Sequence, residues 1–441
     1  MSDAAAPAAP ARIRRRWLRP IATNDLAQYS GAVALGGALV ALTVRFGQMR
    51  GAETDLFPRW YALRQLLLRG RDPYGADVTG EIAAQLALSG APEQVQAAYG
   101  FVYPLPGALL LAPLAMLPYE VAVGVWVAMW LVGLPVVTVA AGRVLAGSDR
   151  LARRDTGRRE VLLATVLALT FLPSMWNVAL AQPGLLAFGL LAGAVWLTRR
   201  RPAMAGAALA AGTLLKPHLV GLVAVAWLVY CLARSNVQKS RRFVAGFLVC
   251  AGALAGAATA LLPAWPVGLA TALTDYGAVS AMRPLAPAVV VGASLILGWA
   301  GLAAAALALV VAGGLAVWTV RAWIAARRSH VWLPVEALSR TVVFGALIVP
   351  PAWETNAIVL LLPIAGVLAA LNERGARTGA VFVVVSAVLS AVLAPLPLVL
   401  PWRSGTMVVL VYVALWSIAR WWLRPAANRG SSRSGAAADA A

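Results

Sequence analysis

The residues best suited to chemistry lie in one polar stretch early in the chain and in short breaks further along. Residues 51–106 hold six of the chain's 17 acidic residues, which are Glu53, Asp55, Asp72, Asp77, Glu81 and Glu93. Lys216 lies close to His218 between two apolar runs. A carboxylate can take a proton from a hydroxyl, and a cation can stabilise a departing phosphate. This set would suit transfer of a sugar from a lipid phosphate, with a single carboxylate as the base.

Each candidate also has a purely structural interpretation. Asp55 precedes a helical pattern and would make a good N-cap. Lys216 could snorkel from a helix break toward the membrane interface. Asp72 opens the sequence Asp-Pro-Tyr-Gly, which is typical of a turn. Arg64 falls on the apolar face of the helix predicted after Asp55, where it could snorkel or meet an anionic ligand.

The helix predicted after Asp55 would lie in the plane of the membrane interface. Its pattern places Leu56, Phe57, Trp60, Leu63 and Leu67 on one face and Arg59, Gln65 and Arg69 on the other.

Two further polar residues interrupt apolar sequence. Gln182 lies in Ala-Gln-Pro-Gly, and an amide there needs hydrogen-bond partners. Glu354 follows two prolines and Trp353. Either could be simple loop polarity. The chain contains no phosphate-binding glycine loop, zinc-ligand spacing or nucleophile elbow.

The composition indicates a polytopic membrane protein, all-α in fold class. Of 441 residues, 61% are hydrophobic and only 12% are charged, against about 25% in soluble domains. The mean hydropathy is +0.78. The net charge of +20 comes from Arg in short turns, a pattern that fixes membrane orientation rather than one that binds nucleic acid. Cys231 and Cys250 lie in apolar runs, so no disulfide frame is expected.

Apolar runs predict about twelve membrane helices, within a range of roughly 10 to 13. They lie near residues 29–47, 105–117, 119–142, 160–180, 183–198, 203–215, 218–233, 242–262, 288–320, 336–349, 356–371, 378–396 and 406–423. The run at 105–117 is short and would re-enter or reach half depth. We expect a basic cytoplasmic tail (1–27), a membrane domain (28–424) whose first outer loop spans 48–106, and a disordered cytoplasmic tail (425–441).

The basic residues favour one orientation. With both termini inside, the inner turns and tails would hold 28 of the 37 Lys and Arg residues. The first loop, Gln182, Lys216, a loop at 263–287 and the turn containing Glu354 would then all face outward. One side of the membrane would carry nearly all of the candidate chemistry.

Several short motifs occur in an order that resembles the GT-C membrane glycosyltransferases, and within them glycosyltransferase family 87. They are Thr54-Asp55-Leu56-Phe57, Trp60-Tyr61, Gly70-Arg71-Asp72-Pro73-Tyr74, Phe101-Val102-Tyr103-Pro104, a Gln-Pro-Gly break at Gln182 and Leu215-Lys216-Pro217. The resemblance covers residues 28–424. It implies an inner-membrane enzyme that transfers mannose, or another sugar, from a polyprenyl phosphate to a lipid or glycan acceptor on the outer side.

The resemblance also assigns roles. Asp55 would be the general base in an inverting displacement, without a metal or other cofactor. Lys216, with His218, would face the donor phosphate. The other residues expected to contact substrates are Arg64, Tyr61, Asp72, Tyr74, Tyr103, Gln182 and Glu354.

The chain departs from the family pattern in three places. Tyr-Pro-Leu-Pro stands where Tyr-Pro-Pro is common, Ala181-Gln182 stands for Gly-Gln, and Glu354 stands near a position where some members have a His. A transporter or flippase, and a lipid-linked glycan ligase or polymerase, remain as alternative functions.

Overall fold

The computed structural model describes residues 54–88, 100–146, 154–234, 237–280, 302–329, 333–349, 354–374, 376–394 and 404–423. Within these ranges every regular element is helical, as predicted. In order they are α2 (Leu56–Arg69), α3 (Ala76–Leu88), α5 (Leu105–Ala108), η2 (Leu109–Leu111), α6 (Ala112–Ala115), α7 (Tyr119–Leu145), α8 (Arg154–Thr170), α9 (Leu172–Ala179), α10 (Gly184–Leu197), α11 (Pro202–Leu215), α12 (Pro217–Leu232), α13 (Gln238–Leu261), α14 (Trp265–Ser280), α16 (Leu302–Arg328), α17 (Val335–Ile348), η3 (Glu354–Leu360), α18 (Leu361–Arg374), α19 (Ala376–Leu393) and α21 (Ser404–Leu423).

The longer helices are those of a membrane protein. Five are long and apolar enough to cross a bilayer by length and composition: Tyr119–Leu145, Gln238–Leu261, Ala306–Arg328, Thr355–Arg374 and Thr406–Leu423. Large apolar side chains stay exposed on them, such as Leu248 and Val249 of α13 and Leu309 and Val310 of α16. Exposed apolar surface of this extent suits contact with lipid. Five shorter apolar helices and one bent pair accompany them. The predicted first crossing near 29–47 and both predicted tails lie outside the described residues.

Two segments differ from the predicted pattern. The run at 160–180 is bent by 63° between α8 and α9. The bend occurs because Pro173, in the first turn of α9, cannot continue the hydrogen bonding of α8. The predicted loop at 263–287 contains a helix, α14, from Trp265 to Ser280. The run at 105–117 forms three pieces of four, three and four residues, each too short to cross a bilayer.

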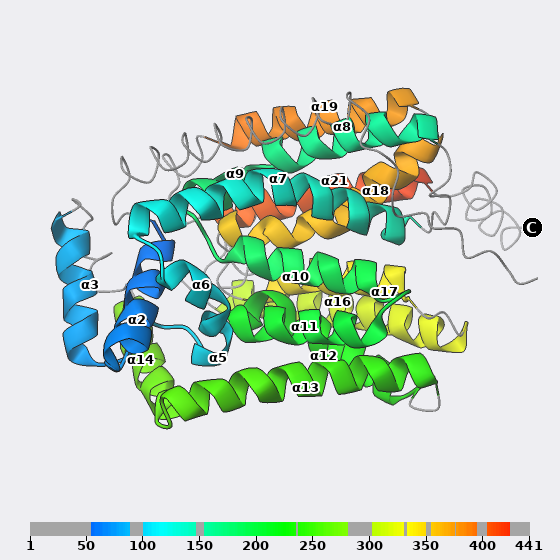
Figure 1. Cartoon of the computed structure of the whole chain (residues 1–441). Helices are drawn as coiled ribbons and strands as arrows, with labels where there is room; N and C mark the ends of the chain where they lie inside the picture. Colours follow the sequence, from blue (N-terminus) through cyan, green and yellow to red (C-terminus); the bar gives the residue numbers. More distant parts are fainter. Residues whose placement is uncertain are drawn as a thin grey trace, which may run out of the picture.

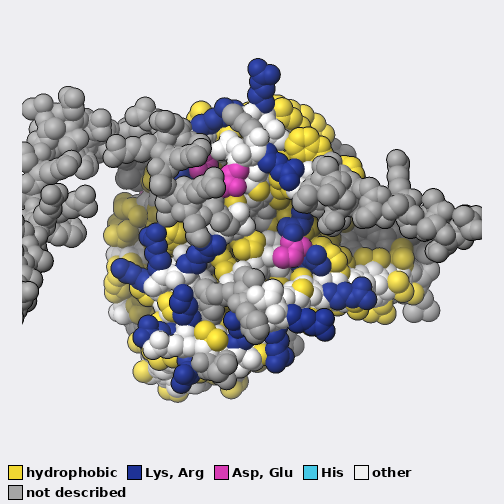
Figure 2. Space-filling model, turned by 90° about the vertical axis from the view of Figure 1, so that its right-hand side faces the viewer, with side chains coloured by type: hydrophobic (Ala, Val, Ile, Leu, Met, Phe, Trp, Pro, Cys, Tyr) yellow, Lys and Arg dark blue, Asp and Glu magenta, His cyan; other side chains and the backbone are white. Residues whose placement is uncertain are grey.

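The two ends of the bundle differ in character. Figure 1 shows the long helices side by side, with α2, α3, α5, α6 and α14 gathered at one end. Lys and Arg side chains cover the opposite end (Figure 2). Arginines occupy the last turns of four helices that finish there: Arg143 of α7, Arg327 and Arg328 of α16, Arg374 of α18 and Arg420 of α21. We call the end that holds α2, α3, α5, α6 and α14 the polar-loop end, and the end that holds these arginines the basic end.

Candidate functional site at the polar-loop end

Asp55 lies where α2 meets the break between α9 and α10. Its backbone N–H donates a hydrogen bond of 2.9 Å to the carbonyl of Leu180. Its side chain is only 8% exposed and makes no capping hydrogen bond to α2. The N-cap interpretation therefore does not account for this carboxylate, although Asp55 does precede the first residue of the helix.

Lys216 occupies the break between α11 and α12 and is 4% exposed. Its Nζ donates a hydrogen bond of 2.9 Å to Oε1 of Gln182. The negative charge of Asp55 and the positive charge of Arg59 both act on this ammonium group. Residues far apart in the sequence thus form one charged cluster of Asp55, Arg59 and Lys216, held to the amide of Gln182. We call these three residues, together with Gln182, the charged cluster.

The break between α9 and α10 has an unusual backbone. Ala181 takes a left-handed conformation with φ of 48°, which a Cβ-bearing residue rarely adopts. The turn then directs the N–H of Gln182 back to the carbonyl of Asn177, at 2.8 Å. A Cβ added to Gly184 would lie 2.6 Å from Oδ1 of Asn177 and 3.4 Å from Nζ of Lys216. Glycine at 184 therefore lets the start of α10 approach the cluster closely.

Asn177 ties this break to η3. It is fully buried, and its Nδ2 donates hydrogen bonds of 2.7 Å to the carbonyls of Pro173 and Thr355. Its Oδ1, on the side of Gly184 and Lys216, has no hydrogen-bond partner. Burying an amide oxygen without a hydrogen-bond partner costs free energy. This oxygen also lies near the ammonium group of Lys216. The adjoining Asn356 forms a hydrogen bond with His218, which brings His218 to the same place.

Arg59 lies one helical turn after Asp55 and is 2% exposed. Its Cζ lies 3.6 Å from the ring centroid of Tyr103, a cation–π contact. Tyr74 then donates a hydrogen bond of 2.6 Å to the carbonyl of Tyr103. Arg59 and Gln65 belong to the predicted face of α2 opposite the apolar residues, and both are buried. Their side of the helix is covered by other parts of the chain rather than by water.

The remaining polar residues of α2 fix the helix in place. Arg64 donates hydrogen bonds to the carbonyls of Ala115 and Leu117, at 2.9 and 3.2 Å. It therefore ties α2 to the end of α6 and to the residues that follow it. Tyr61 donates a hydrogen bond of 2.7 Å from its hydroxyl to Glu81 of α3.

Arg71 closes the same framework through an ion pair with Asp77 at 2.7 Å and one with Glu81 at 2.9 Å. Its guanidinium, by hydrogen bonding, lowers the pKa of both carboxyls below their ordinary values. Both carboxylates are therefore held ionised near neutral pH. Through Arg71 they anchor α3 to the turn that connects it with α2.

The predicted site residues thus fall into two groups. Asp55, Lys216, Gln182 and His218 come together at the polar-loop end, and Tyr103 reaches the charged cluster through Arg59.

The other predicted residues lie in the surrounding framework. Asp72 is exposed, and its Oδ1 accepts a hydrogen bond from the backbone N–H of Tyr74, as in the turn that its sequence suggests. Tyr61, Arg64 and Tyr74 connect helices. Glu354 is the first residue of η3, and its side chain lies outside the described residues.

Two residues of the site were not predicted. Arg59 could have been found from its spacing, since residues four apart on a helix share a face and Arg59 follows Asp55 by four. Asn177 could have been found as an amide inside the apolar run at 160–180, by the argument applied to Gln182. In the part of the chain that the structure describes, no group of three or more His, Cys, Asp or Glu side chains is placed to hold a metal ion.

Comparison with known proteins identifies the family. The model of glycosyltransferase family 87 matches residues 101–351, more than half of the chain. Searches of curated proteins and of solved structures found no match. The matched range contains Tyr103, Gln182 and Lys216, whereas Asp55 and Arg59 precede it. With its multiple apolar helices, the chain is a membrane glycosyltransferase and belongs to glycosyltransferase family 87.

Proposed function

We propose that the protein transfers a hexose, mannose in the first instance, from a polyprenyl-phosphate sugar to a hydroxyl of a lipid or glycan acceptor. The observation that carries the proposal is the convergence of Asp55, at the start of α2, and Lys216, in the break between α11 and α12, which act on each other electrostatically. Mannose and the polyprenyl carrier are inferred from the resemblance of the motifs to GT-C enzymes. The family match favours a transferase over a transporter or flippase.

The chemistry proceeds as one inverting displacement. The Asp55 carboxylate accepts the proton of the acceptor hydroxyl while the acceptor oxygen forms a bond to the anomeric carbon. The bond from that carbon to the phosphate oxygen breaks, and its electron pair leaves on polyprenyl phosphate. Lys216 and Arg59 stabilise the added negative charge, so a general acid is not needed. These two cations supply the positive charge that a metal ion would otherwise bring.

Membrane orientation supports an outer location for the reaction. Arg-rich ends of helices face the cytoplasm by the positive-inside rule. The charged cluster lies among the polar-loop elements, and the Lys and Arg side chains gather at the opposite end (Figures 1 and 2). We therefore assign the polar-loop end to the extracytoplasmic side of the plasma membrane and both termini to the cytoplasm, with about twelve crossings in the complete chain.

The test is sugar transfer by purified protein in nanodiscs, with radiolabelled polyprenyl-phosphate mannose as donor. We expect Asp55→Asn to lose about 10²- to 10⁴-fold in rate, the usual contribution of a general base. Asp77→Asn is the matched control, because Asp77 lies in the same loop but is exposed and paired with Arg71. Equal rates for Asp55→Asn and wild type, at equal abundance and thermal stability, would remove Asp55 from the mechanism.

The same assay separates the alternative enzymes. A lipid-linked glycan ligase or polymerase uses a diphosphate carrier, so it would be active with a polyprenyl-diphosphate donor and inactive with the monophosphate. Mass spectrometry of the products distinguishes the two. Flux of the labelled donor across proteoliposomes without any transfer product would instead support the transporter alternative.

A further inference from the structure

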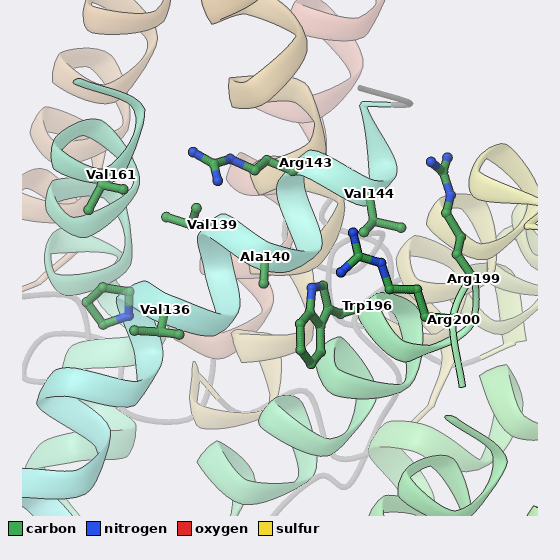
Figure 3. A pocket seen from close by; sticks show the side chains of 10 residues that line it. Val136, Val139, Ala140, Arg143, Val144, Val161, Trp196, Arg199 and Arg200 are labelled. Atoms are coloured by element: carbon green, nitrogen blue, oxygen red, sulfur yellow. The ribbon is translucent and has the colours of Figure 1, made fainter. Parts of the chain in front are cut away.

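A hollow of about 420 Å³ lies far from the charged cluster, toward the basic end of the bundle. It is bordered by the second half of α7, by Val161 of α8 and by Trp196 at the end of α10 (Figure 3). Its volume is within the range of about 300 to 1,000 Å³ that is usual for small-molecule sites. None of the residues proposed for sugar transfer lines it.

One part of the hollow is apolar. Val136, Val139 and Ala140 of α7 face Val161 and Trp196 across it (Figure 3). Val136 and Trp196 are exposed in the isolated chain. These helices are apolar and belong to the membrane domain, so the surroundings of this groove are lipid rather than water. Hydrocarbon is therefore the natural occupant of the apolar part.

The other part of the hollow is cationic. Arg143 of α7 and Arg199 and Arg200 after α10 line it. The Nε–H of Arg143 is shared between the two carboxylate oxygens of Glu160, at 2.9 and 3.0 Å, so this arginine already has an acidic partner. Arg199 and Arg200 lie at the end of α10 beside Trp196, a residue type that is common at membrane interfaces. Three of the ten residues that line the hollow are arginines, and none of the ten is acidic, so its lining is complementary to an anion.

We propose that this groove binds a phospholipid with an anionic headgroup from the leaflet at the basic end. An acyl chain lies along Val136, Val139 and Ala140, and the headgroup phosphate is bound by Arg199 and Arg200. Apolar lining continuous with a cluster of arginines is complementary to an amphipathic anion and to neither a free sugar nor a free phosphate alone. Clustered basic residues at this depth bind anionic lipids in other membrane proteins.

Native mass spectrometry of detergent-purified protein with added phosphatidylglycerol tests the proposal. We expect Arg199→Gln combined with Arg200→Gln to weaken binding by roughly fivefold for each arginine removed. Arg241→Gln combined with Arg242→Gln is the matched control, because both arginines are exposed on α13 and neither lines the groove. Equal losses in the two double variants would show that the lipid follows overall charge, and would overturn the proposal.

Two further measurements examine the two halves of the ligand. Ala140→Phe fills the apolar part and should reduce phosphatidylglycerol binding while the arginines remain. Unchanged binding in this variant would contradict the acyl-chain position. Phosphatidylcholine and glycerol 3-phosphate serve as comparison ligands, and binding of either as tight as that of phosphatidylglycerol would overturn an anionic lipid as the occupant. Thermal unfolding without added lipid verifies that each variant is folded.

Discussion

The ammonium group of Lys216 and the side-chain oxygen of Gln182 are joined by a hydrogen bond of 2.9 Å. This bond connects two helix breaks, one between α11 and α12 and one between α9 and α10. Each break leaves backbone groups that cannot bond within a helix, and such breaks are tolerated in membrane proteins where the interior supplies partners. The pair therefore fixes a cation at a defined point beside Asp55.

The charge of Lys216 can be tested apart from its hydrogen bond. We expect Lys216→Gln to lower kcat by about 10²- to 10³-fold, the usual cost of removing one group that stabilises developing charge. Lys216→Arg keeps the charge but replaces a compact ammonium with a planar fork, so it should retain more activity than Lys216→Gln. Initial rates at saturating donor give kcat. A kcat equal to wild type in Lys216→Gln would exclude a role in leaving-group stabilisation.

The stacking of Arg59 on Tyr103 predicts a second result. Tyr103→Phe keeps the ring under the guanidinium and should leave activity near wild type. Tyr103→Leu removes the π face, whose contact with a buried cation is worth about 2 kcal/mol, and should reduce kcat/KM by roughly tenfold or more. The comparison uses the same transfer assay. Similar losses in both variants would assign the effect to the hydroxyl group instead of to the ring.

The helices were predictable from the sequence to a large extent, and their ends less so. The run at 203–215 corresponds to α11 and the run at 218–233 to α12, because proline and the polar Lys216 bound them. The bend between α8 and α9 was missed because Pro173 lies within a continuous apolar stretch, where hydropathy does not change.

The site was predictable in its charges but not in its environment. Asp55 and Lys216 stood out because charges are rare in this chain. Helical spacing placed Arg59 on the polar face of α2, yet it is buried against Tyr103. Periodicity describes one helix at a time and cannot show that distant segments cover both of its faces. Asn177 was not predicted for the same reason, because the carbonyl that it binds belongs to Thr355, 178 residues away.

The close approach at Gly184 gives a third prediction. Gly184→Ala would place a Cβ 2.6 Å from Oδ1 of Asn177, so the break must shift or Asn177 must move. We expect a loss of about 1 to 3 kcal/mol in unfolding free energy and a clear fall in transfer rate. Gly193→Ala is the matched control on α10, since nothing lies within 4 Å of an added Cβ there.

A double variant separates this contact from a general effect on α10. Asn177→Ala removes the atom with which the new methyl group collides. If the collision is the cause, Gly184→Ala should destabilise the Asn177→Ala background less than it destabilises wild type. Purely additive effects on the melting temperature would contradict a direct contact between the two positions.

The left-handed conformation of Ala181 provides a fourth prediction, which concerns stability alone. With φ of 48°, the Cβ of Ala181 costs about 1 to 2 kcal/mol, and glycine avoids that cost. Glycine also gives the unfolded chain about 0.5 to 1 kcal/mol more conformational entropy, so Ala181→Gly should stabilise the protein by a net ~0.5 kcal/mol. Ala257→Gly, at an exposed position with ordinary helical geometry in α13, should instead destabilise it by about 1 kcal/mol. Thermal unfolding in nanodiscs measures both changes. A gain in stability for Ala181→Gly and a loss for Ala257→Gly would agree with the left-handed backbone at Ala181. Destabilisation by both substitutions would contradict the prediction, because Ala181 would then gain more from its buried methyl group than it loses by its conformation.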